Sequence, residues 1–449
     1  GLSGLGGSAT GRVRLTGAAT APVFDGTLDL DLRSEDRAVG TLQLDVAYEE
    51  LSASLDARLS HRKGRALTVS GSVPADLRLQ APAPTSLSDR PVRIEASTDQ
   101  FPLDWVDPFF DPATVRSITG TLTADARVQG TLGAPELSGT ASVAGAGASL
   151  PPINTTYQDG RAQLQLAGNE LTLKSARLRT SNDGSLGANG TISLPELTVG
   201  EYDLTLEASD FLAINTPAYR RTVMDGNIAL RGTVRRPVLS GDMQVQSGSV
   251  YYTEALAESA AAMGAVTLTS QDQLTLEERF GLQLTSADTT TFDAYEAMAL
   301  DLNVQIQSNT WLRSTSNPEM NVQFTGDLDV QKSPLQDPQV FGTIEVLESR
   351  STLRQFGQEF QITEGSLTFN GDPLTPYLDL TAVYDQRAQG SQSSEVRITL
   401  SLSGRPDNLS PSLSSEPTMS TRNIFSYLAT GRPADALFSG NAEGGSLAT

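Results

Sequence analysis

Apolar and polar residues alternate along most of this chain, and this pattern limits the folds that it can form. Between Leu300 and Ile306, apolar residues are separated one by one by Asp301, Asn303 and Gln305. Successive side chains of a β-strand point to opposite faces, so a run with period two predicts a strand with one apolar and one wet face. Because such runs recur along the chain, the sequence predicts a nearly all-β protein of antiparallel strands joined by short links.

A repeated phrase predicts how these strands are organised. It reads Gly-Thr-x-x-x-Pro-x-Leu-x-Gly at residues 130–139 and again at 232–241, and looser copies lie near Pro22 and Pro338. Similarity that returns about every hundred residues is typical of an extended array. This period is too long for one coil of a solenoid, so each unit of the array must contain several strands.

Two short motifs predict tight turns. Asp159-Gly160 and Asn182-Asp183-Gly184 are typical of tight hairpin turns, which need a positive φ.

Three segments interrupt the alternation. Residues 101–118 have bulky residues at helical spacing and predict short helical turns at one end of a sheet; their aromatic residues are expected in local packing, with a lipid gate as the alternative. Residues 253–264 predict a helix or an irregular insertion. Residues 420–429 predict a short helix that starts after a cap residue and follows an irregular segment at 407–417.

Composition argues against nucleic acid and against most catalytic sites. The net charge is −21, whereas a phosphate-binding surface needs clustered Lys and Arg. Without Cys there is no disulfide or thiolate metal site, and the only histidine, His61, is expected in an exposed basic turn. Acidic residues such as Asp29 and Asp31 are expected on the solvated face. We therefore predict no enzyme, no metal and no cofactor.

The apolar faces of these strands must be covered, and two arrangements achieve this. A second sheet would give a sandwich or barrel core, and periodicity alone favours that closed core. A sheet that curls on itself would instead leave an apolar trough.

Six phrases near the end of the chain occur in a specific order. They are Phe-Gly-Gln-Glu-Phe-Gln-Ile at 356–362, Glu-Gly-Ser-Leu-Thr-Phe-Asn-Gly at 364–371, Pro-Tyr-Leu-Asp-Leu at 376–380, Leu-Ser-Gly at 402–404, Ser-Ser-Glu-Pro-Thr-Met-Ser at 414–420 and Ile-Phe-Ser-Tyr-Leu-Ala-Thr-Gly at 424–431. In this order and spacing they resemble the C-terminal region of the TamB family. The repeated Gly-Thr phrase is typical of the same family further upstream, so the resemblance covers most of residues 97–432.

The resemblance implies a long, curled antiparallel β-sheet with a U-shaped apolar groove, also called a β-taco. It implies four segments: a β-rich repeat segment at 1–96, β-taco repeats at 97–310, a TamB-type C-terminal groove domain at 311–432 and a flexible tail at 433–449. Apolar residues of the later strands are expected to line the groove, and residues of the short helix are expected to contact a partner. The expected groove residues are Leu300, Leu302, Val304, Ile306, Val322, Phe324, Leu328, Val330, Ile344, Val346, Leu367, Phe369, Leu378, Leu380, Val396, Ile398, Leu400 and Leu402, and the expected partner contacts are Ile424, Phe425 and Leu428.

The function that the resemblance implies is a conduit for phospholipid between the inner and outer membranes. The implied partners are phospholipid, both membranes and an outer-membrane barrel protein of the TamA or related type. We expect a periplasmic location with an inner-membrane anchor outside this chain, because no apolar run here approaches the roughly 18 residues of a membrane span and the chain starts without Met.

Such a conduit needs an apolar face but no nucleophile, metal or base. Exposing acyl chains to water costs about 0.8 kcal/mol per CH₂, hence on the order of 20 kcal/mol for two chains, and a continuous apolar face removes most of that barrier. Two other functions stay open. One is an assembly factor for outer-membrane and autotransporter proteins that binds the barrel partner, for example by strand addition at the edge of residues 396–402, without lipid transport. The other is a surface β-solenoid, such as an adhesin or a polysaccharide-active enzyme.

Overall fold

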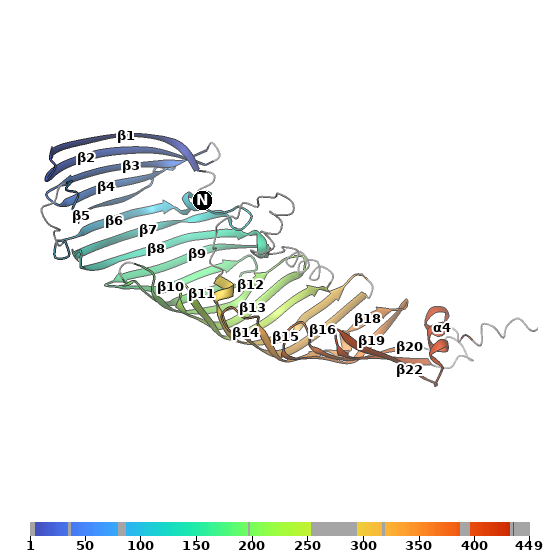
Figure 1. Cartoon of the computed structure of the whole chain (residues 1–449). Coiled ribbons are helices and arrows are strands. Elements are labelled where there is room, and N and C mark those ends of the chain that lie inside the picture. Colours follow the sequence, from blue (N-terminus) through green and yellow to red (C-terminus); the bar gives the residue numbers. More distant parts are fainter. Residues whose placement is uncertain are drawn as a thin grey trace, which may run out of the picture. The chain divides into compact units, whose positions relative to one another are not determined.

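Figure 1 shows a computed structural model of the chain, which describes residues 5–34, 37–79, 87–195, 198–252, 294–316, 319–386, 396–431 and 434. Most of these residues are in antiparallel strands and the helices are short, so the prediction of an all-β antiparallel fold is confirmed. The chain divides into two compact units. Unit 1 contains Gly1–Ala213 and Asp225–Val238, and unit 2 contains Ile214–Met224 and Leu239–Thr449.

In unit 1, strands β1 to β12 pair in the order of the sequence, each antiparallel to the next. Short links make this order possible because an antiparallel pair needs only a hairpin turn. The strands are β1 (Leu5–Ala18), β2 (Ala21–Ser34), β3 (Arg37–Glu49), β4 (Ser52–His61), β5 (Ala66–Pro74), β6 (Arg93–Pro102), β7 (Arg116–Thr131), β8 (Ala134–Leu150), β9 (Thr155–Ala167), β10 (Glu170–Thr180), β11 (Ser185–Ser193) and β12 (Glu201–Ile214).

The repeated phrase marks a particular kind of hairpin. Gly17, Gly130 and Gly232 each precede a turn and have φ of 84°, 102° and 110°. A Cβ atom at these positions would lie only 2.4, 2.6 and 2.3 Å from the carbonyl oxygen of the residue four places further on. Only glycine has both the conformation and the space that these turns require. The phrase is therefore a hairpin signature.

The predicted turns have different outcomes. Asp183 has φ of 67° in the hairpin between β10 and β11, so that prediction is confirmed. The prediction at Asp159-Gly160 is wrong, because both residues lie inside β9, where the pairing with β8 shifts register around Gly160. Asp159 has φ of 53° there, and a bulge and a tight turn both need such a residue.

Short 3₁₀ helices connect some of the strands of unit 1. The first, η1 (Leu103–Phe109), confirms the helical turns expected between residues 101 and 118, and the second is η2 (Pro151–Ile153). Trp105 of η1 packs between the rings of Phe101 and Phe109, at centroid distances of 6.3 and 5.1 Å. Trp105 thus takes part in local packing.

In unit 2, the described strands from β15 onward form one antiparallel layer. Strand β16 pairs with both β17 and β18, so these two are halves of one strand that η4 (Glu348–Arg350) interrupts. The strands are β15 (Ala299–Ser314), β16 (Glu319–Lys332), β17 (Gln339–Val346), β18 (Thr352–Gln355), β19 (Gln358–Gly371), β20 (Tyr377–Gln386), β21 (Val396–Arg405) and β22 (Asn408–Glu416); the one-turn helix α3 (Ala294–Ala297) precedes them. Strands β13 (Tyr219–Thr233) and β14 (Arg236–Tyr251) contain residues of both units.

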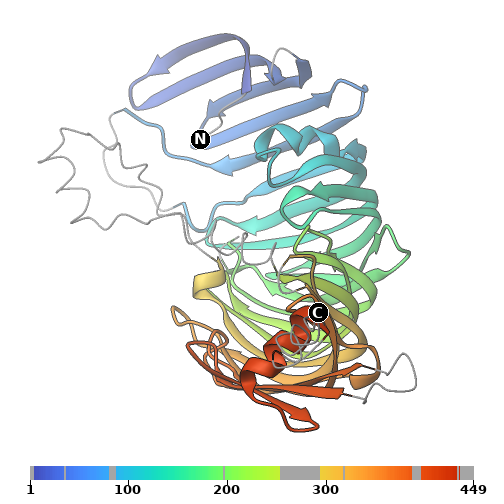
Figure 2. The same ribbon diagram turned by 90° about the vertical axis from the view of Figure 1, so that its right-hand side faces the viewer.

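The predicted C-terminal helix is confirmed as α4 (Thr421–Thr430). The Ser420 side chain accepts the Asn423 N–H at 3.4 Å, and Gly431 ends the helix with φ of 74°. Figure 2 shows α4, in red, within the curve of the last strands.

Two expectations for the segment before α4 are wrong. Residues 407–417 are not irregular, because β22 occupies most of them. Its alternation is hidden in the sequence, since serines fill the wet face while Leu409, Pro411 and Leu413 fill the other. Residues 396–402 do not form an edge, because β21 lies between β20 and β22.

Other expectations concern the boundaries between the four predicted segments of the chain. The predicted limits at 96/97 and 310/311 fall within β6 and β15, so they mark no break between strands, and the four-segment division stays a prediction. The expected helix or insertion at 253–264 lies outside the described residues, as does the expected tail apart from residue 434.

Candidate functional site

The register of unit 2 brings the predicted groove residues to one face of the layer. Paired residues of antiparallel strands direct their side chains to the same side. One row crosses the layer through Ile306, Gly326, Ile344, Leu367 and Leu378, each paired with the next. By the same register, all the predicted groove residues from Leu300 to Leu402 lie on this side, which we call the unit 2 apolar face. The register therefore places these residues on one shared face, and their role in lining a lipid groove stays a prediction.

The opposite side of the same strands is polar. Asn303 donates from Nδ2 to Asp329 Oδ1 at 3.1 Å across β15 and β16, and serines and threonines dominate the pairs between β20 and β21. Phe341 is an exception, since it lies on this polar side with 37 % of its surface exposed. Each strand thus separates an apolar from a wet face, as the alternation predicted.

Unit 1 has an apolar face of its own. A row passes through Leu28, Leu44, Ala57, Val69 and Ala96. The row then continues across the remaining strands through Ala126, Gly139, Leu166, Leu171, Ile192 and Tyr202. These residues were absent from the predicted groove set, although the same alternation marks them in the sequence.

Both apolar faces are only partly covered. Most apolar side chains on them are half-buried, and Val13 and Leu15 on β1 keep 67 % and 61 % of their surface exposed. A closed sandwich or barrel core would bury such side chains, but within each unit the described strands lie in a single layer. The apolar faces are therefore open surfaces over much of their area.

Helix α4 covers one part of the unit 2 apolar face, and the side chains beneath it are buried. Ile424 and Leu428 are each 1 % exposed and belong to a cluster of buried apolar residues, which we call the α4 cluster. Its sheet members come from the unit 2 apolar face and are Val322, Phe360, Ile362, Ala382, Val396 and Ile398. Of these, Phe360, Ile362 and Ala382 were missed in the predicted groove set, although the phrase Phe-Gln-Ile at 360–362 shows the alternation.

The predicted partner residues of the helix thus lie in two environments. Ile424 and Leu428 pack onto the sheet and present no surface to a partner while α4 is docked. Phe425 points away from the α4 cluster, is 44 % exposed and contacts the ring of Phe356 edge-on at a centroid distance of 5.4 Å. Partner contact at these three residues stays a prediction.

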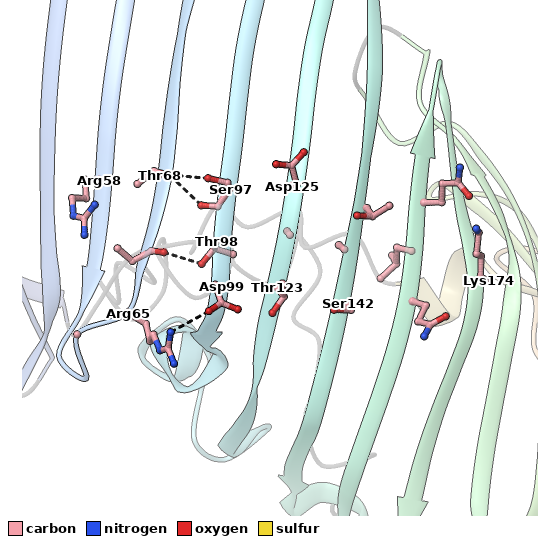
Figure 3. Close-up of a pocket in the computed structure, with 18 residues that line it drawn as sticks. Arg58, Arg65, Thr68, Ser97, Thr98, Asp99, Thr123, Asp125, Ser142 and Lys174 are labelled. Carbon is pink, nitrogen blue, oxygen red and sulfur yellow. Dashed lines mark hydrogen bonds and ion pairs between the residues drawn. The ribbon is translucent and has the colours of Figure 1, made fainter.

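A hollow in the surface of unit 1 has a different character. It measures about 740 Å³ and lies over the strands from β4 to β10 in unit 1 (Figure 3). Thr68 and Ser97 share a hydrogen bond in it, and Arg65 pairs with Asp99 at 3.2 Å. Its hydroxyl, amide and charged groups suit water or a polar ligand, and acyl chains would gain little there.

His61 differs from its prediction. It is not an exposed turn residue, since only 3 % of its surface is exposed, and its Nε2 lies 3.2 Å from Asp104 Oδ1 in η1. Its Nδ1 accepts the Lys63 N–H at 3.1 Å, so the neutral ring carries its proton on Nε2. Burial lowers the pKa of His61, and it outweighs the opposing effect of the Asp104 carboxylate.

The Asp104 carboxylate joins this cluster to its basic neighbours. Arg62 Nη2 and Lys63 Nζ lie 3.2 and 3.0 Å from its Oδ2. Burial raises the pKa of Asp104, but the hydrogen bonds from Lys63 and Arg62 prevail and the pKa is lowered. This arrangement attaches η1 to the hairpin between β4 and β5.

Within the part of the chain that the structure describes, no three His, Asp or Glu side chains gather as a metal site. In the same part, no helix has the length and apolarity to cross a membrane.

Comparison with known proteins gives a family for this arrangement. Residues 172–449 match the family model of the TamB C-terminal domain. The chain is also similar to the translocation and assembly module subunit TamB of Haemophilus influenzae, with 20 % identity over 329 residues. That alignment covers 71 % of this chain and 24 % of the relative, so the chain spans about a quarter of the relative's length.

Proposed function

Because this chain belongs to the TamB family, we propose that it is part of a translocation and assembly module of the cell envelope and contributes apolar surface to a phospholipid conduit. The observation that supports this proposal most directly is the open apolar face of each unit. A half-exposed apolar face over many strands is costly in water, and acyl chains that lie against it would be removed from water as well. The protein would act by solvation alone and would need no catalytic group.

The proposed partners follow from this role. The ligand is phospholipid, and the whole protein would reach both the inner and the outer membrane across the periplasm. An inner-membrane anchor would lie outside this chain, and a TamA-type outer-membrane barrel protein would receive the other end. The polar faces, on which Asp385 pairs with Arg397, would stay in water.

A second function has its own support. An assembly factor that binds a barrel protein needs an accessible contact surface, and the exposed pair Phe356 and Phe425 offers one. The outer edge of β22 pairs with no other described strand and offers a site for strand addition. Barrel binding without bound lipid would favour this function. A surface solenoid has no comparable support in the described residues.

Lipid photolabelling tests the conduit. Purified protein is mixed with phosphatidylethanolamine–phosphatidylglycerol vesicles that contain a phospholipid with a diazirine in one acyl chain, and labelled residues are mapped by mass spectrometry. We expect labels on the apolar faces, for example at Leu44 and Ile344, and few on polar-face neighbours such as Gln43 and Glu345. Labels that are equally frequent on both faces, or absent from both, would contradict the proposal.

A further inference from the structure

The unit 2 apolar face is accessible along part of its width and closed at β19 to β21, where α4 lies on it. Leu302, Ile344, Leu367 and Leu378 are half-buried, whereas Phe360, Ile362, Ala382 and Ile398 are at most 1 % exposed. All of them lie on the same side of one layer. Helix α4 covers these four residues, and neighbouring side chains of the layer, such as Leu353 and Tyr384, pack around them.

The surface under α4 has the same chemistry as the open surface. Ala382 pairs with Leu400, and the next row toward the open part pairs Leu380 with Leu402. No charged side chain separates the two rows on this face. An acyl chain that follows the open rows would meet the helix rather than a polar barrier.

The attachment of α4 is limited. Two side chains, Ile424 and Leu428, anchor it in the α4 cluster, while Met419 and Tyr427 are only partly buried against it. A hydrogen bond from Gln358 Nε2 to the Leu428 carbonyl oxygen, at 2.8 Å, joins strand β19 to the helix. A helix of ten residues is marginal in water without tertiary contacts, so α4 gains its order from this surface.

We propose that the surface beneath α4 is a terminal acyl-chain site, and that α4 and lipid compete for it. When α4 is docked, Ile424 and Leu428 take the place of acyl groups and end the accessible apolar face. When α4 leaves, Phe360, Ile362, Ala382 and Ile398 become available to lipid. The same departure exposes the apolar side of α4, which would suit a barrel or membrane surface. This inference rests on the conduit function proposed above.

A reversible lock on α4 tests the competition. The chain has no Cys, and Phe356 and Phe425 are in contact and both 44 % exposed. A Phe356→Cys/Phe425→Cys variant is joined by a bismaleimide with a disulfide in its spacer, and reduction of that spacer frees the helix in the same protein. Photolabelling with the diazirine phospholipid is compared before and after reduction at covered residues (Ile362, Ile398) and at open residues (Leu302, Ile344).

We expect open residues to be labelled equally in both states. Covered residues should be labelled at least about tenfold more after reduction, because the locked helix excludes lipid; Ile424→Ala in the uncrosslinked protein should raise their labelling further, since it removes one anchor. Equal labelling of covered residues in the locked and released protein, at whatever level, would overturn the inference. Absence of label from the open residues as well would instead show that the conduit function itself is wrong.

The two cysteine substitutions also remove an aromatic contact, so folding is checked by circular dichroism in both states. Tyr384 and Tyr427 pack against the α4 cluster, so a difference between the near-ultraviolet spectra of the locked and reduced forms reports a change in helix docking. If Ile424→Ala unfolds unit 2, the locked and reduced forms of the double variant still decide the question, because they differ only in the tether.

Discussion

At the scale of single residues, the strands depend on a few positions where one side chain alone fits. The hairpin glycines are such positions, since both their conformation and a nearby carbonyl oxygen exclude a Cβ atom. His61 is another, because it is buried against η1 and still makes two polar contacts. Each of these residues supports a different prediction for unit 1.

The first prediction concerns Gly130. Gly130→Ala should lower the free energy of unfolding of unit 1 by about 2–4 kcal/mol, since it combines a disfavoured φ with a Cβ 2.6 Å from the Ala134 carbonyl oxygen. Gly168→Ala is the matched control: Gly168 has φ of 60° but nothing within 4 Å of its Cβ position, so its loss should be about 1 kcal/mol. Urea unfolding with Trp105 fluorescence in a Trp311→Phe background reports unit 1. Equal losses in the two variants would contradict the steric explanation.

The second prediction concerns the pH dependence of unit 1. Because burial lowers the pKa of His61 below its usual 6.5, the unfolded chain binds this proton more tightly than the folded protein does. The resulting stabilisation is complete above pH 6.5 and is lost as the pH falls below that value toward the lowered pKa. Unit 1 should therefore unfold at a lower urea concentration at pH 5.5 than at pH 7.5.

The control for this prediction is His61→Gln, which keeps a donor toward Asp104 and removes the titration. Because the chain has a single histidine, the loss of stability between these two pH values should be clearly smaller in His61→Gln than in the wild type. The Asp104 carboxylate contributes a separate effect, because its lowered pKa gives stability that is lost only as the pH falls below 3.8. An unchanged pH dependence in His61→Gln would show that His61 is not the titrating group.

At the scale of elements, α4 is the longest described helix, and it contributes two residues to the buried apolar cluster of unit 2. Substitutions on its two sides should reduce the stability of unit 2 by different amounts. Leu428→Ala should reduce the stability of unit 2 by about 3 kcal/mol, since it removes a buried anchor. Phe425→Ala on the exposed side should cost about 1 kcal/mol or less, mainly through the lost contact with Phe356. Trp311 fluorescence in a Trp105→Phe background measures both, and equal losses would contradict the orientation of α4.

How far the sequence predicted these elements depends on the range of the contacts that determine them. Alternation is local, so it predicted the strands and the shared face of the groove residues, and the cap residue Ser420 predicted the start of α4. Strand β22 was missed because serine occupies its wet face, and the bulge at Gly160 was mistaken for a turn because both need a positive φ.

Contacts between distant residues left no local signal. The burial of His61 depends on Asp104 and Phe101, which follow it by about forty residues and reach it only through the pairing of β4, β5 and β6. In the same way, the position of α4 on β19 to β21 depends on where the layer curves. The helix itself was predictable, but the surface that it covers was not.

At the scale of the whole molecule, both units repeat one construction: a single antiparallel layer with an apolar face, a polar face and a short helical element at one border. The polar faces carry exposed ion pairs such as Arg231–Asp203 and Arg397–Asp385, which are compatible with water. Among the described residues, only η1 and α4 cover parts of the apolar faces. A ligand with long apolar chains would cover the rest and remove it from water. The need for such a cover arises from the whole face and not from any one side chain.

The last prediction follows from that collective property. Phe324 lies on the unit 2 apolar face, where it pairs with Val346, while Phe341 lies on the polar face of the neighbouring strand. Phe324→Arg should strongly reduce photolabelling of Ile344 and Leu367, because a charge forced against acyl chains costs several kcal/mol of desolvation. Phe341→Arg introduces the same charge on the wet side and should leave labelling within about twofold of the wild type, and Phe324→Leu should do so too because it keeps the surface apolar. Circular dichroism checks that each variant is folded. Unchanged labelling in a folded Phe324→Arg variant would rule out a path over this face, whereas unfolding of that variant alone would indicate that Phe324 belongs to a closed core.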